Sequence, residues 1–492
     1  MKFIKDVVIV GGGTAGLVSS LLLKEFFPTY NVKLLKSSDI GIIGVGEGST
    51  EHWQFFMDKV SMDVYNLINE TDATIKYGIL FKDWKEKNTS YSHSVTINDN
   101  PRDPSGYLPL FDQLIFKDKD NPYILSGNFD KFVKEKSVAF QLLSSNQYHF
   151  DTHKLNVFLQ KECIKKGIII EEHYIEDIKL DKNGNIKTLI NNKKEKIKGD
   201  FFIDCTGFKR LLSSKLNSKF ISYKKYLPVN RAITLSTPLN LNKGIEPYTQ
   251  AIALSSGWYW RIPTQTRYGN GYVFSDEYIT SDNALKEFNI ALNTNFDSPI
   301  KDIKFEAGRI DKFWNKNCVS IGLSSGFIEP LEAQSIGFSI IQAYSVVEYL
   351  NTWLENPKIS EKYNNEIINS FNNTVDYIQL HYFSQRTDSK FWKDKPYEIT
   401  EFNKETFDLF SKGIIPGHYF DTPKLLFNRE NFYQVYYGLG LLNKEFINDR
   451  LKNMPKQKIE FIKNLYNDYI ISNNKRMSHI SYLNSIKINH SF

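Results

Sequence analysis

The feature that most constrains this chain is a glycine-rich turn close to its start. Residues 7–10 form an unbroken apolar run, VVIV, and an apolar helical pattern resumes at residue 17. Between them lies the spacing G-x-G-x-x-G, in which Gly11 makes a tight turn, Gly13 lets the backbone approach a pyrophosphate and Gly16 lets helix pack on strand. Free N–H groups at the helix N-terminus favour phosphate. The pattern predicts a strand buried on both faces and a dinucleotide-binding turn, with a glycine-rich turn that holds no ligand as the alternative.

The position that should hold the ribose departs from this pattern. A second strand at 32–35 completes a β-α-β unit. An acidic residue about 20 residues after the glycines usually binds the ribose hydroxyl. Here that position is Lys36. Three neighbours, or a backbone contact, could supply the missing interaction: Ser37, Ser38 and Asp39.

A later segment indicates which dinucleotide binds. Residues 201–207, FFIDCTG, predict a buried strand that ends in a turn of small residues. Such a strand and turn, long after an N-terminal G-x-G-x-x-G, is typical of a flavin-binding Rossmann sheet and points to FAD rather than NAD. The chain shows no second dinucleotide fingerprint, so we do not expect NAD(P)H to bind.

Composition excludes several other classes of protein. The 492 residues are 41% hydrophobic and carry a net charge of +6, which gives no case for a nucleic-acid partner. The three cysteines lack C-x-x-C spacing, so neither a disulfide framework nor a thiolate metal site is expected. His149 and His153 could share a metal on a helix, but Asp151 is better explained as a helix N-cap, and we expect no metal. No apolar stretch reaches about 18 residues, and the early first strand leaves no room for a signal peptide, so we expect a cytoplasmic protein with no membrane partner.

The strand and helix patterns divide the chain. We expect an α/β protein with a Rossmann-type FAD-binding module over residues 1–350. An antiparallel substrate sheet is inserted at 211–304, where aromatic residues alternate along 258–263 and 272–274. Residues 351–492 form a mainly helical C-terminal part that covers the substrate.

Several segments together resemble the flavin-dependent tryptophan-halogenase family. The most specific is GWYWRIP at 257–263, which fits the signature W-x-W-x-I-P without a mismatch. The other matching segments are ATIKYGI at 73–79, GVGE at 44–47, FIEPLE at 327–332, and, more weakly, DCTGF at 204–208, LPVNRA at 227–232, GR at 308–309 and HY at 381–382. The resemblance covers residues 1 to about 395.

This resemblance implies a reaction and two catalytic residues. Such enzymes use FADH2, O2 and a halide ion to make hypohalous acid at the flavin, and a lysine holds that acid beside an electron-rich aromatic substrate. By resemblance the lysine is Lys76, although composition alone would make it an exposed strand lysine. Glu332 matches the second essential residue, which would orient Lys76 or act as a general base. Its other interpretation is a carboxylate favoured by a helix N-terminus.

The resemblance also implies the surroundings of the reaction. Trp258 and Trp260 would form the partition between flavin and substrate, and a separate flavin reductase would supply FADH2. The halide is expected at the backbone amides of Gln334 and Ser335. The residues expected to contact the cofactor are Gly11, Gly13, Thr14, Ala15, Gly16, Gly46, Glu47, Gly48, Ser49, Ile175, Leu323 and Ile336.

Two segments depart from the family. Where many members read ESTGI, this chain reads EAQSI at 332–336, and the loss of the glycine changes which backbone conformations are accessible. We therefore hypothesise a preference for bromide or iodide over chloride. Members that bind tryptophan carry an aromatic residue shortly after a substrate-site histidine. Here the nearest match is His93 in YSHSV, with no aromatic residue in that place, so another phenol, indole or activated arene is expected.

Two other functions remain as alternatives at this stage. An FAD-dependent aromatic monooxygenase would need the substrate at the flavin and no Lys76. A catalytically inactive flavin-binding protein would keep only the nucleotide fold. The oligomeric state, including a homo-oligomer, is left open by the sequence.

Overall fold

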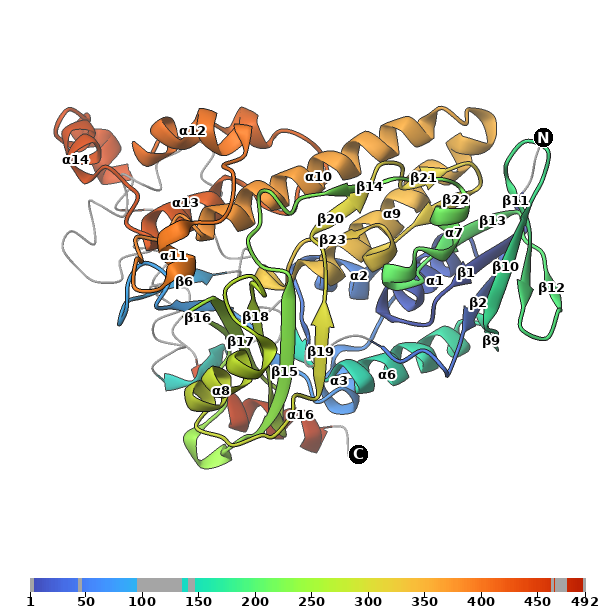
Figure 1. The fold of residues 1–492 in the computed structure, drawn as a ribbon, viewed down its shortest axis with the longest axis horizontal. Helices are drawn as coiled ribbons and strands as arrows, with labels where there is room; N and C mark the ends of the chain where they lie inside the picture. Colours follow the sequence, from blue (N-terminus) through green and yellow to red (C-terminus); the bar gives the residue numbers. More distant parts are fainter. Residues whose placement is uncertain are drawn as a thin grey trace.

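The first layer of the fold is a six-stranded sheet. The computed structural model describes residues 4–42, 47–94, 135–139, 147–461, 464 and 476–489. The sheet has the order β21-β22-β13-β1-β2-β9, and its strands from β22 to β9 are parallel (Figure 1). Its strands are β1 (Asp6–Val10), β2 (Asn31–Lys36), β9 (Ile169–Glu172), β13 (Phe201–Asp204), β21 (Trp314–Asn315) and β22 (Cys318–Ser320). This arrangement confirms the predicted Rossmann-type sheet.

Strand β1 is buried on both of its faces, as its apolar run predicts. Val7 and Ile9 lie in the main hydrophobic core with residues of the helices α1, α6 and α9. Val8 and Val10 lie in a second cluster with residues of the small sheet β10-β11-β12 and of α7. Covering both faces of a parallel sheet is what makes its strands read as continuous apolar runs. These elements are α1 (Thr14–Phe26), α6 (Thr152–Lys165), α7 (Leu211–Lys215), α9 (Gln334–Glu355), β10 (Ile175–Leu180), β11 (Ile186–Asn191) and β12 (Lys196–Ile197).

The second large layer is a seven-stranded sheet, in the order β19-β15-β18-β17-β16-β5-β6. Its strands are β5 (Gly78–Lys82), β6 (Ser90–Ser94), β15 (Arg231–Pro238), β16 (Thr249–Leu254), β17 (Gly257–Pro263), β18 (Arg267–Phe274) and β19 (Lys301–Lys304). All neighbours are antiparallel except β16 and β5. The sheet therefore joins the expected insertion to two strands from residues 78–94, far earlier in the chain. Helix α8 (Ser281–Leu292) packs on its outer face through Phe288.

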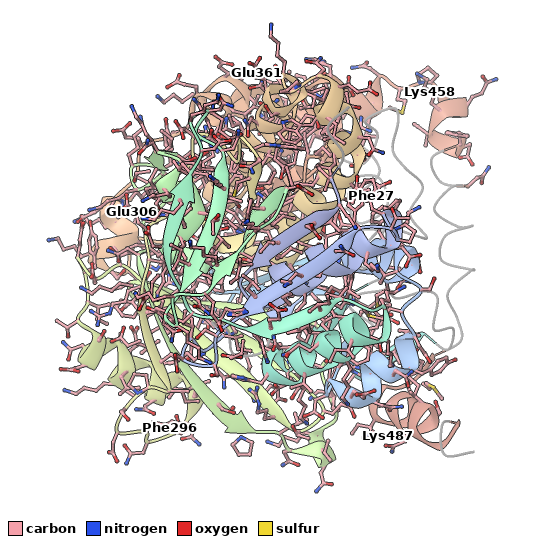
Figure 2. The ribbon with its side chains drawn as sticks, turned by 90° about the vertical axis from the view of Figure 1, so that its right-hand side faces the viewer. Phe27, Phe296, Glu306, Glu361, Lys458 and Lys487 are labelled. Carbon is pink, nitrogen blue, oxygen red and sulfur yellow. The ribbon has the colours of Figure 1, made fainter. Side chains whose placement is uncertain are left out.

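Helices dominate the described C-terminal residues, as expected. They are α10 (Ile359–His381), α11 (Lys390–Asp394), α12 (Glu401–Ser411), α13 (Arg429–Gly438), α14 (Lys444–Lys452) and α16 (His479–Asn489). Helix α10 spans the upper edge of Figure 1, from the six-stranded sheet to α12 and α13. In Figure 2, Glu361 near the start of α10 and Lys487 in α16 lie at opposite ends of the view. Residues of both large sheets and of these helices, apart from α14, share one continuous core.

Short strands tie distant segments together. They are β3 (Glu47–Gly48), β4 (Thr74–Ile75), β7 (Ser137–Ala139), β8 (Tyr148–Phe150), β14 (Phe220–Ser222), β20 (Gly308–Ile310), β23 (Gly326–Phe327) and β24 (Arg476–Ser478), and the remaining helices are α2 (His52–Lys59) and α3 (Val64–Glu70). Strand β8 pairs with both β3 and β4. Strand β24 pairs with β7, which brings α16 against α3. Chain segments hundreds of residues apart thus meet beside β4.

Most local predictions are confirmed, with one exception. The turn at residues 183–184 predicts a hairpin between strands at 175–180 and 186–190, and β10 and β11 form it. The Asp151 carboxylate caps α6 by accepting hydrogen bonds from the backbone of His153 and Lys154. The residues VSIGL at 319–323 predict a buried strand over that whole range, but β22 ends at Ser320 and a short 3₁₀ turn follows. Gly322 is left-handed there, with φ of 71°, and a Cβ on it would lie 2.6 Å from the Cβ of Ala15. The chain turns because it passes so close to the glycine loop and α1.

Among the described residues, no helix is long and apolar enough to cross a membrane. The same residues contain no group of His, Cys, Asp and Glu side chains that could hold a metal ion. His149, one of the two histidines considered for a metal, instead lies within hydrogen-bonding distance of two hydroxyl groups. Its Nδ1 is 3.1 Å from the Thr74 hydroxyl and its Nε2 is 2.9 Å from the Thr249 hydroxyl.

Candidate active site

A cavity of about 1000 Å³ runs between the two large sheets. One end is lined by the glycine loop after β1 and by the ends of β2 and β13, which we call the nucleotide end. The other end is lined by Gly48, Glu332 and Ala333, which we call the reaction end. Strands β15 to β17 form one wall between the two ends. A ligand that fills the nucleotide end is therefore in the same space as the residues of the reaction end.

The glycine loop fits a pyrophosphate. A Cβ on Gly11, whose φ is 119°, would lie 2.1 Å from the Cys205 carbonyl oxygen, and a Cβ on Gly16 would lie 1.9 Å from the Gly11 carbonyl oxygen. These two glycines are required by the packing of the protein itself. A Cβ on Gly13 would meet no protein atom within 4 Å, so this glycine leaves open space in the cavity. Gly13 is also the N-cap of α1 and gives it no side-chain cap, so the first N–H groups of the helix are available to an anion.

Lys36 lies where the ribose contact is expected. Its ammonium group donates to Gln160 Oε1 at 2.9 Å, Gln160 Nε2 donates to Asn156 Oδ1 at 2.6 Å, and Asn156 Nδ2 donates to the Gly12 carbonyl oxygen at 2.8 Å. All four residues line the cavity, as does Ile175. The Gln160 and Asn156 contacts were not anticipated, because α6 is more than a hundred residues from the glycines. The donors, the open cradle and the cavity size fit FAD.

The other predicted cofactor residues fall into three groups. Those that line the cavity are Gly11, Gly13, Thr14, Ala15, Gly48, Leu323 and Ile336. Gly16 and Ser49 do not line the cavity. Gly16 packs closely against the Gly11 carbonyl oxygen, and the Ser49 carbonyl oxygen accepts a hydrogen bond from Lys76. Gly46 lies outside the described residues, and Glu47 is described only as part of β3.

Trp258 and Trp260, predicted as a partition, both line the cavity from β17. Their rings are 6.2 Å apart. The neighbouring strand makes room for the second ring, since a Cβ on Gly271 would lie 2.0 Å from the indole of Trp260. The Trp258 indole is buried and its Nε1 donates to Glu329 Oε1 at 3.1 Å. Both residues thus line the cavity that contains the nucleotide and reaction ends.

Lys76 is buried beside Gly48 of the reaction end and does not itself line the cavity as the described residues define it, so the composition-only interpretation of an exposed lysine is wrong. It follows β4, only 1% of it is exposed, and its ammonium group donates to the Ser49 carbonyl oxygen at 2.7 Å. Its Nζ lies 3.6 Å from the position of a Cβ on Gly48. Burial lowers the pKa of Lys76 to about 8, although the nearby carboxylates of Glu332 and Glu51 favour the charged form. Desolvation outweighs these charges, so the amine can exchange a proton near neutral pH.

Glu332 occupies a strained turn just before α9. Glu332 and Ala333 have φ of 69° and 54°, which place two consecutive non-glycine residues in the left-handed region. His93 Nδ1 donates to Glu332 Oε2 at 2.7 Å, and His381 Nε2 lies 3.3 Å from Oε1. Burial by itself raises the pKa of Glu332, but the charge and hydrogen bonds of His93 and His381 outweigh it and hold this pKa far below its usual range. Glu332 is therefore held as a carboxylate.

The sequence predicts His93 at the substrate, but its described contacts are with other protein side chains. Its described contacts are with Glu332, with the Tyr377 hydroxyl at 3.1 Å and with Asn431 Nδ2 at 2.8 Å, and it does not line the cavity as far as the described residues define it. His381, on α10, was noted in the sequence only as part of a weak match. Its Nδ1 lies 2.9 Å from the Tyr91 hydroxyl. The convergence of two histidines on one carboxylate has no local signal in the sequence, because 288 residues separate them.

The two predicted halide residues differ in their surroundings. Ser335 lines the cavity in the first turn of α9, next to Glu332 and Ala333. Gln334 turns its side chain away from the cavity, and its Nε2 donates to the Glu329 carbonyl oxygen at 2.7 Å. Glu329 itself is a fully buried carboxyl group that the sequence analysis quoted only within a motif.

The fold and the cavity define a flavin-dependent oxidoreductase of Rossmann type. Residues 6–455 match the tryptophan halogenase family. The chain is 31% identical to the tryptophan 7-halogenase RebH of Lentzea aerocolonigenes over 498 aligned residues, which cover 92% of each protein. Its structure resembles Xcc4156, a flavin-dependent halogenase from Xanthomonas campestris, with a TM-score of 0.86, 26% identity and 99% coverage of both chains. It also resembles Tar14, described as a tryptophan C-6 flavin-dependent chlorinase from taromycin biosynthesis, with a TM-score of 0.84, 26% identity, and coverage of 98% and 100%.

The chain therefore belongs to the tryptophan halogenase family, and it is a flavin-dependent halogenase. Its reaction uses FADH2, O2 and a halide to halogenate an aromatic substrate. This confirms the resemblance drawn from the W-x-W-x-I-P segment, and it weighs against both the monooxygenase and the inactive flavin-binding protein.

Proposed function

We propose that Lys76 carries hypohalous acid from the flavin to an electron-rich aromatic substrate that is not free tryptophan. The observation that supports this most is the burial of Lys76 at the reaction end, with its ammonium group against the Ser49 carbonyl oxygen at 2.7 Å. A buried amine is costly, and Lys76 lies beside Gly48, which lines the cavity, so a role in the reaction accounts for its burial.

The chemistry at Lys76 follows from its environment. Hypohalous acid is a small electrophile that reacts with many groups, so an amine or ammonium group must hold it beside one carbon of the substrate. Burial tunes the charge of Lys76 for this purpose, since it brings the pKa to about 8. The same burial excludes water, which strengthens each electrostatic contact of the amine.

Glu332 is proposed as the base that completes the substitution. When an aromatic ring gains a halogen cation, the ring carbon must lose a proton to restore aromaticity. The carboxylate of Glu332 is kept ionised by His93 and His381, and Glu332 lines the cavity. It can accept that proton and become a neutral carboxylic acid.

The nucleotide end holds the cofactor. When bound, FAD in its reduced form supplies the two electrons with which O2 is converted into an oxidant for the halide. The glycine loop and the first turn of α1 would hold the pyrophosphate, and Lys36 with Gln160 would hold the adenosine ribose. We propose that a separate flavin reductase supplies FADH2, because the sequence shows no second dinucleotide fingerprint.

The substrate and halide proposals rest on the two departures from the family. RebH and Tar14 are named for tryptophan, but this chain has Ser94 and Val95 where an aromatic clamp residue follows the histidine. We propose a phenol, another indole or an activated arene. For the halide, the N–H groups of Gln334 and Ser335 open α9 and suit an anion. We propose that bromide or iodide is preferred, although Tar14 is described as a chlorinase.

The experiment compares wild-type protein with Lys76→Ala and Lys76→Arg. Each is supplied with FAD, a flavin reductase, NADH, O2 and a small arene library, with chloride, bromide or iodide in separate reactions, and the products are examined by mass spectrometry. We expect Lys76→Ala to lose halogenated product by about 10³-fold while FAD affinity stays within about twofold. Oxygenated product that is insensitive to Lys76→Ala would select a monooxygenase. A strong preference of the wild-type protein for chloride would defeat the halide proposal, and efficient turnover of free tryptophan would defeat the substrate proposal.

A further inference from the structure

The turn that carries Glu332 begins with a second buried acid, Glu329, whose role the halogenation chemistry does not explain. Its side chain is fully buried, and its carboxyl group has no cationic partner among the described residues. Burial raises the pKa of Glu329 to about 8, and hydrogen bonds from Tyr382 and Trp258 oppose that shift. A buried carboxyl group without a cation is costly, so its retention calls for an explanation.

The contacts of Glu329 join three parts of the active site. Trp258 Nε1 donates to Oε1 at 3.1 Å from β17, and the Tyr382 hydroxyl donates to Oε1 at 3.0 Å from the end of α10. The backbone of Glu329 takes part as well, because its carbonyl oxygen accepts the bond from Gln334 Nε2 at 2.7 Å. One residue therefore links the wall that holds Trp258, the long helix α10 and the start of α9.

The two residues held between these contacts are the strained ones. Glu332 and Ala333 lie in the left-handed region, and this conformation persists only where surrounding contacts enforce it. Gln334 closes the turn back onto Glu329 by a side-chain bond. The Glu329 side chain fastens the beginning of the same turn to β17 and α10. The segment 329–334 is thus anchored at both of its ends.

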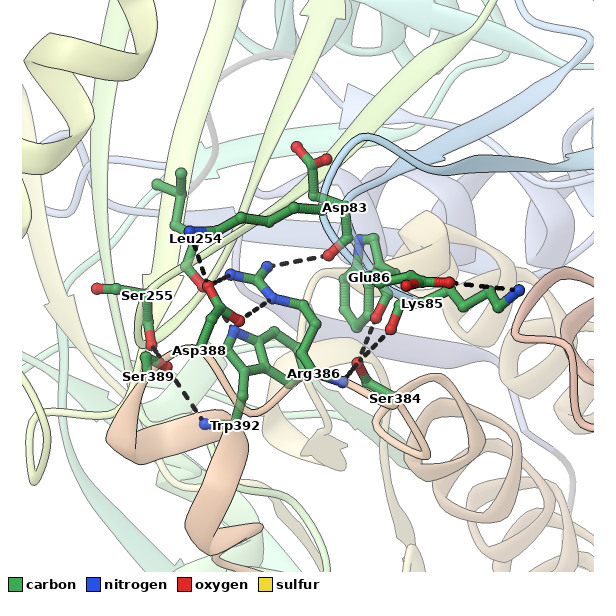
Figure 3. A network of polar contacts seen from close by, with 12 residues as sticks. Asp83, Lys85, Glu86, Leu254, Ser255, Ser384, Arg386, Asp388, Ser389 and Trp392 are labelled. Carbon is green, nitrogen blue, oxygen red and sulfur yellow. Dashed lines mark hydrogen bonds and ion pairs between the residues drawn. The ribbon is translucent and has the colours of Figure 1, made fainter.

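Tyr382, which donates to Glu329, is itself held in place by its packing against Trp392. Its ring stacks on Trp392 at 6.1 Å, and Trp392 Nε1 donates to the Leu254 carbonyl oxygen at 2.7 Å. Figure 3 shows the polar network around Trp392. There Arg386 donates to the Asp83 carbonyl oxygen at 2.9 Å and forms two bonds to the Asp388 carboxylate, at 2.8 and 2.9 Å. The guanidinium lies 5.0 Å from the Trp392 ring. Packed rings and paired charges thus leave the Tyr382 hydroxyl little freedom.

We propose that Glu329 is a positioning residue, which fixes the Trp258 indole as the cavity wall and holds the strained turn that presents Glu332. For the reaction, this positioning contains the oxidant within the cavity. With Trp258 and Glu332 in place, the oxidant made at the flavin reaches the reaction end; with either displaced, it escapes before it meets the substrate. The containment part rests on the proposed function, whereas the anchoring part concerns the protein alone.

The test uses a conservative and a disruptive variant of the same residue. Glu329→Gln keeps an oxygen that accepts from Trp258 and Tyr382, whereas Glu329→Leu leaves both buried donors without an acceptor. Tyr382→Phe removes the hydrogen bond from Tyr382 to Glu329 with little change of shape. It replaces Glu329→Leu as the test variant if Glu329→Leu does not fold. Glu366→Leu is the control, because Glu366 is also a buried acid that accepts bonds from a tyrosine, Tyr349 at 2.8 and 2.9 Å. It pairs with Lys362 at 4.0 Å, and its described bonds do not involve Trp258, Tyr382 or the turn at 329–334.

Two readouts separate positioning from general stability. The first is the ratio of halogenated arene to halogenated cyclic 1,3-diketone, a scavenger added to trap hypohalous acid that escapes. We expect Glu329→Leu to shift this ratio toward the scavenger by about tenfold, and Tyr382→Phe by about threefold. Glu329→Gln and the control Glu366→Leu should stay within about twofold of wild type, and FAD affinity should stay within about twofold in all variants.

The second readout is a crystal structure of each variant without substrate. We expect Glu329→Leu to displace the Trp258 indole or to return Glu332 to negative φ, and Glu329→Gln to do neither. The proposal is overturned if Glu329→Leu leaves both unchanged, or if Glu366→Leu shifts the product ratio equally. If wild-type protein halogenates neither arene nor scavenger, the proposed function fails instead, and the structures alone decide on the anchoring.

Discussion

The two ends of the cavity are built in different ways. The pyrophosphate cradle of the nucleotide end is formed by β1, the glycine loop and α1, which are consecutive in the sequence, and its left-handed residue is a glycine, Gly11. The ends of β2 and β13, together with α6, add further lining residues. The reaction end is assembled from strand β4, the turn before α9, and the helix α10. It contains a buried lysine, buried carboxylates, and left-handed residues that are not glycine. The pyrophosphate cradle is relaxed and local, whereas the reaction end is costly and depends on segments from across the chain.

This difference is what catalysis requires. Binding a pyrophosphate needs N–H groups and space, which a short segment can supply. Confining a reactive electrophile needs charges out of water, and those charges are stable only where many segments converge on them. The cost of the reaction end should therefore be visible as lost stability, and changes there should affect activity more than changes at the nucleotide end.

The largest effect is expected for Glu332→Gln. The amide keeps the shape of the side chain and can still contact His93 and His381, but it cannot accept a proton. We expect the turnover number to fall by about 10²–10³-fold, with FAD affinity unchanged. Single-turnover halogenation with pre-reduced enzyme measures this. Equal activity of the variant would show that Glu332 only orients its neighbours, and the contrast between the two ends would weaken.

The second prediction tests the cost of burying Lys76. The pKa of Lys76 is about 8 in the folded protein and near 10.5 when the side chain is exposed. Below pH 8 the folded protein therefore holds a buried charged amine, which lowers its stability, whereas in the unfolded chain this charge is in water. Lys76→Met should therefore be inactive but more stable by about 3 kcal/mol at pH 7. The unfolded chain binds more protons between pH 8 and 10.5, so wild-type stability should rise through this window and the advantage of the variant should disappear.

Urea unfolding at pH 7 and pH 10 measures this difference. Lys196→Met is the control, because Lys196 is an exposed lysine on β12 and its loss should change stability little at either pH. A Lys76→Met variant that is less stable than wild type at pH 7 would contradict the assigned burial cost.

The third prediction separates the roles of two glycines at the nucleotide end. Gly13→Ala should fold with unchanged stability, because its Cβ meets no protein atom within 4 Å, but it should weaken FAD binding by about tenfold because the methyl group enters the cavity. Gly11→Ala should instead destabilise the protein, since its Cβ would lie 2.1 Å from the Cys205 carbonyl oxygen. Thermal unfolding and FAD titration distinguish the two. If Gly13→Ala binds FAD as tightly as the wild-type protein does, the pyrophosphate does not bind at this loop.

The smallest effect is expected at Lys36. A partly exposed cation near the ribose and pyrophosphate contributes little in water, so Lys36→Gln should weaken FAD binding by only about threefold and reduce its dependence on salt. Lys33→Gln, on the same strand but paired with Glu171 at 3.0 Å, is the control. FAD titration at low and high salt measures both. An increase in affinity in Lys36→Gln would mean that this position disfavours the cofactor.

Local elements were predictable because their causes lie within a few residues. The apolar run before Gly11 predicts β1, the turn at 183–184 predicts the β10–β11 hairpin, and Asp151 predicts the start of α6. Where prediction failed, as at the end of β22, a contact from elsewhere intervened. Gly322 must turn there because Ala15, three hundred residues earlier, lies beside it.

The sequence by itself determined the glycine turn, the alternation of strands and helices, and the family, since each depends on neighbouring residues or on a contiguous motif. Only the tertiary structure decided that Lys76 is buried, that His93 and His381 meet on Glu332, and that Glu329 fastens the turn between them. Burial, and with it the charge state of an amine or a carboxyl group, is fixed by what surrounds the group in space. Segments far apart in the chain provide those surroundings, and no local pattern records them.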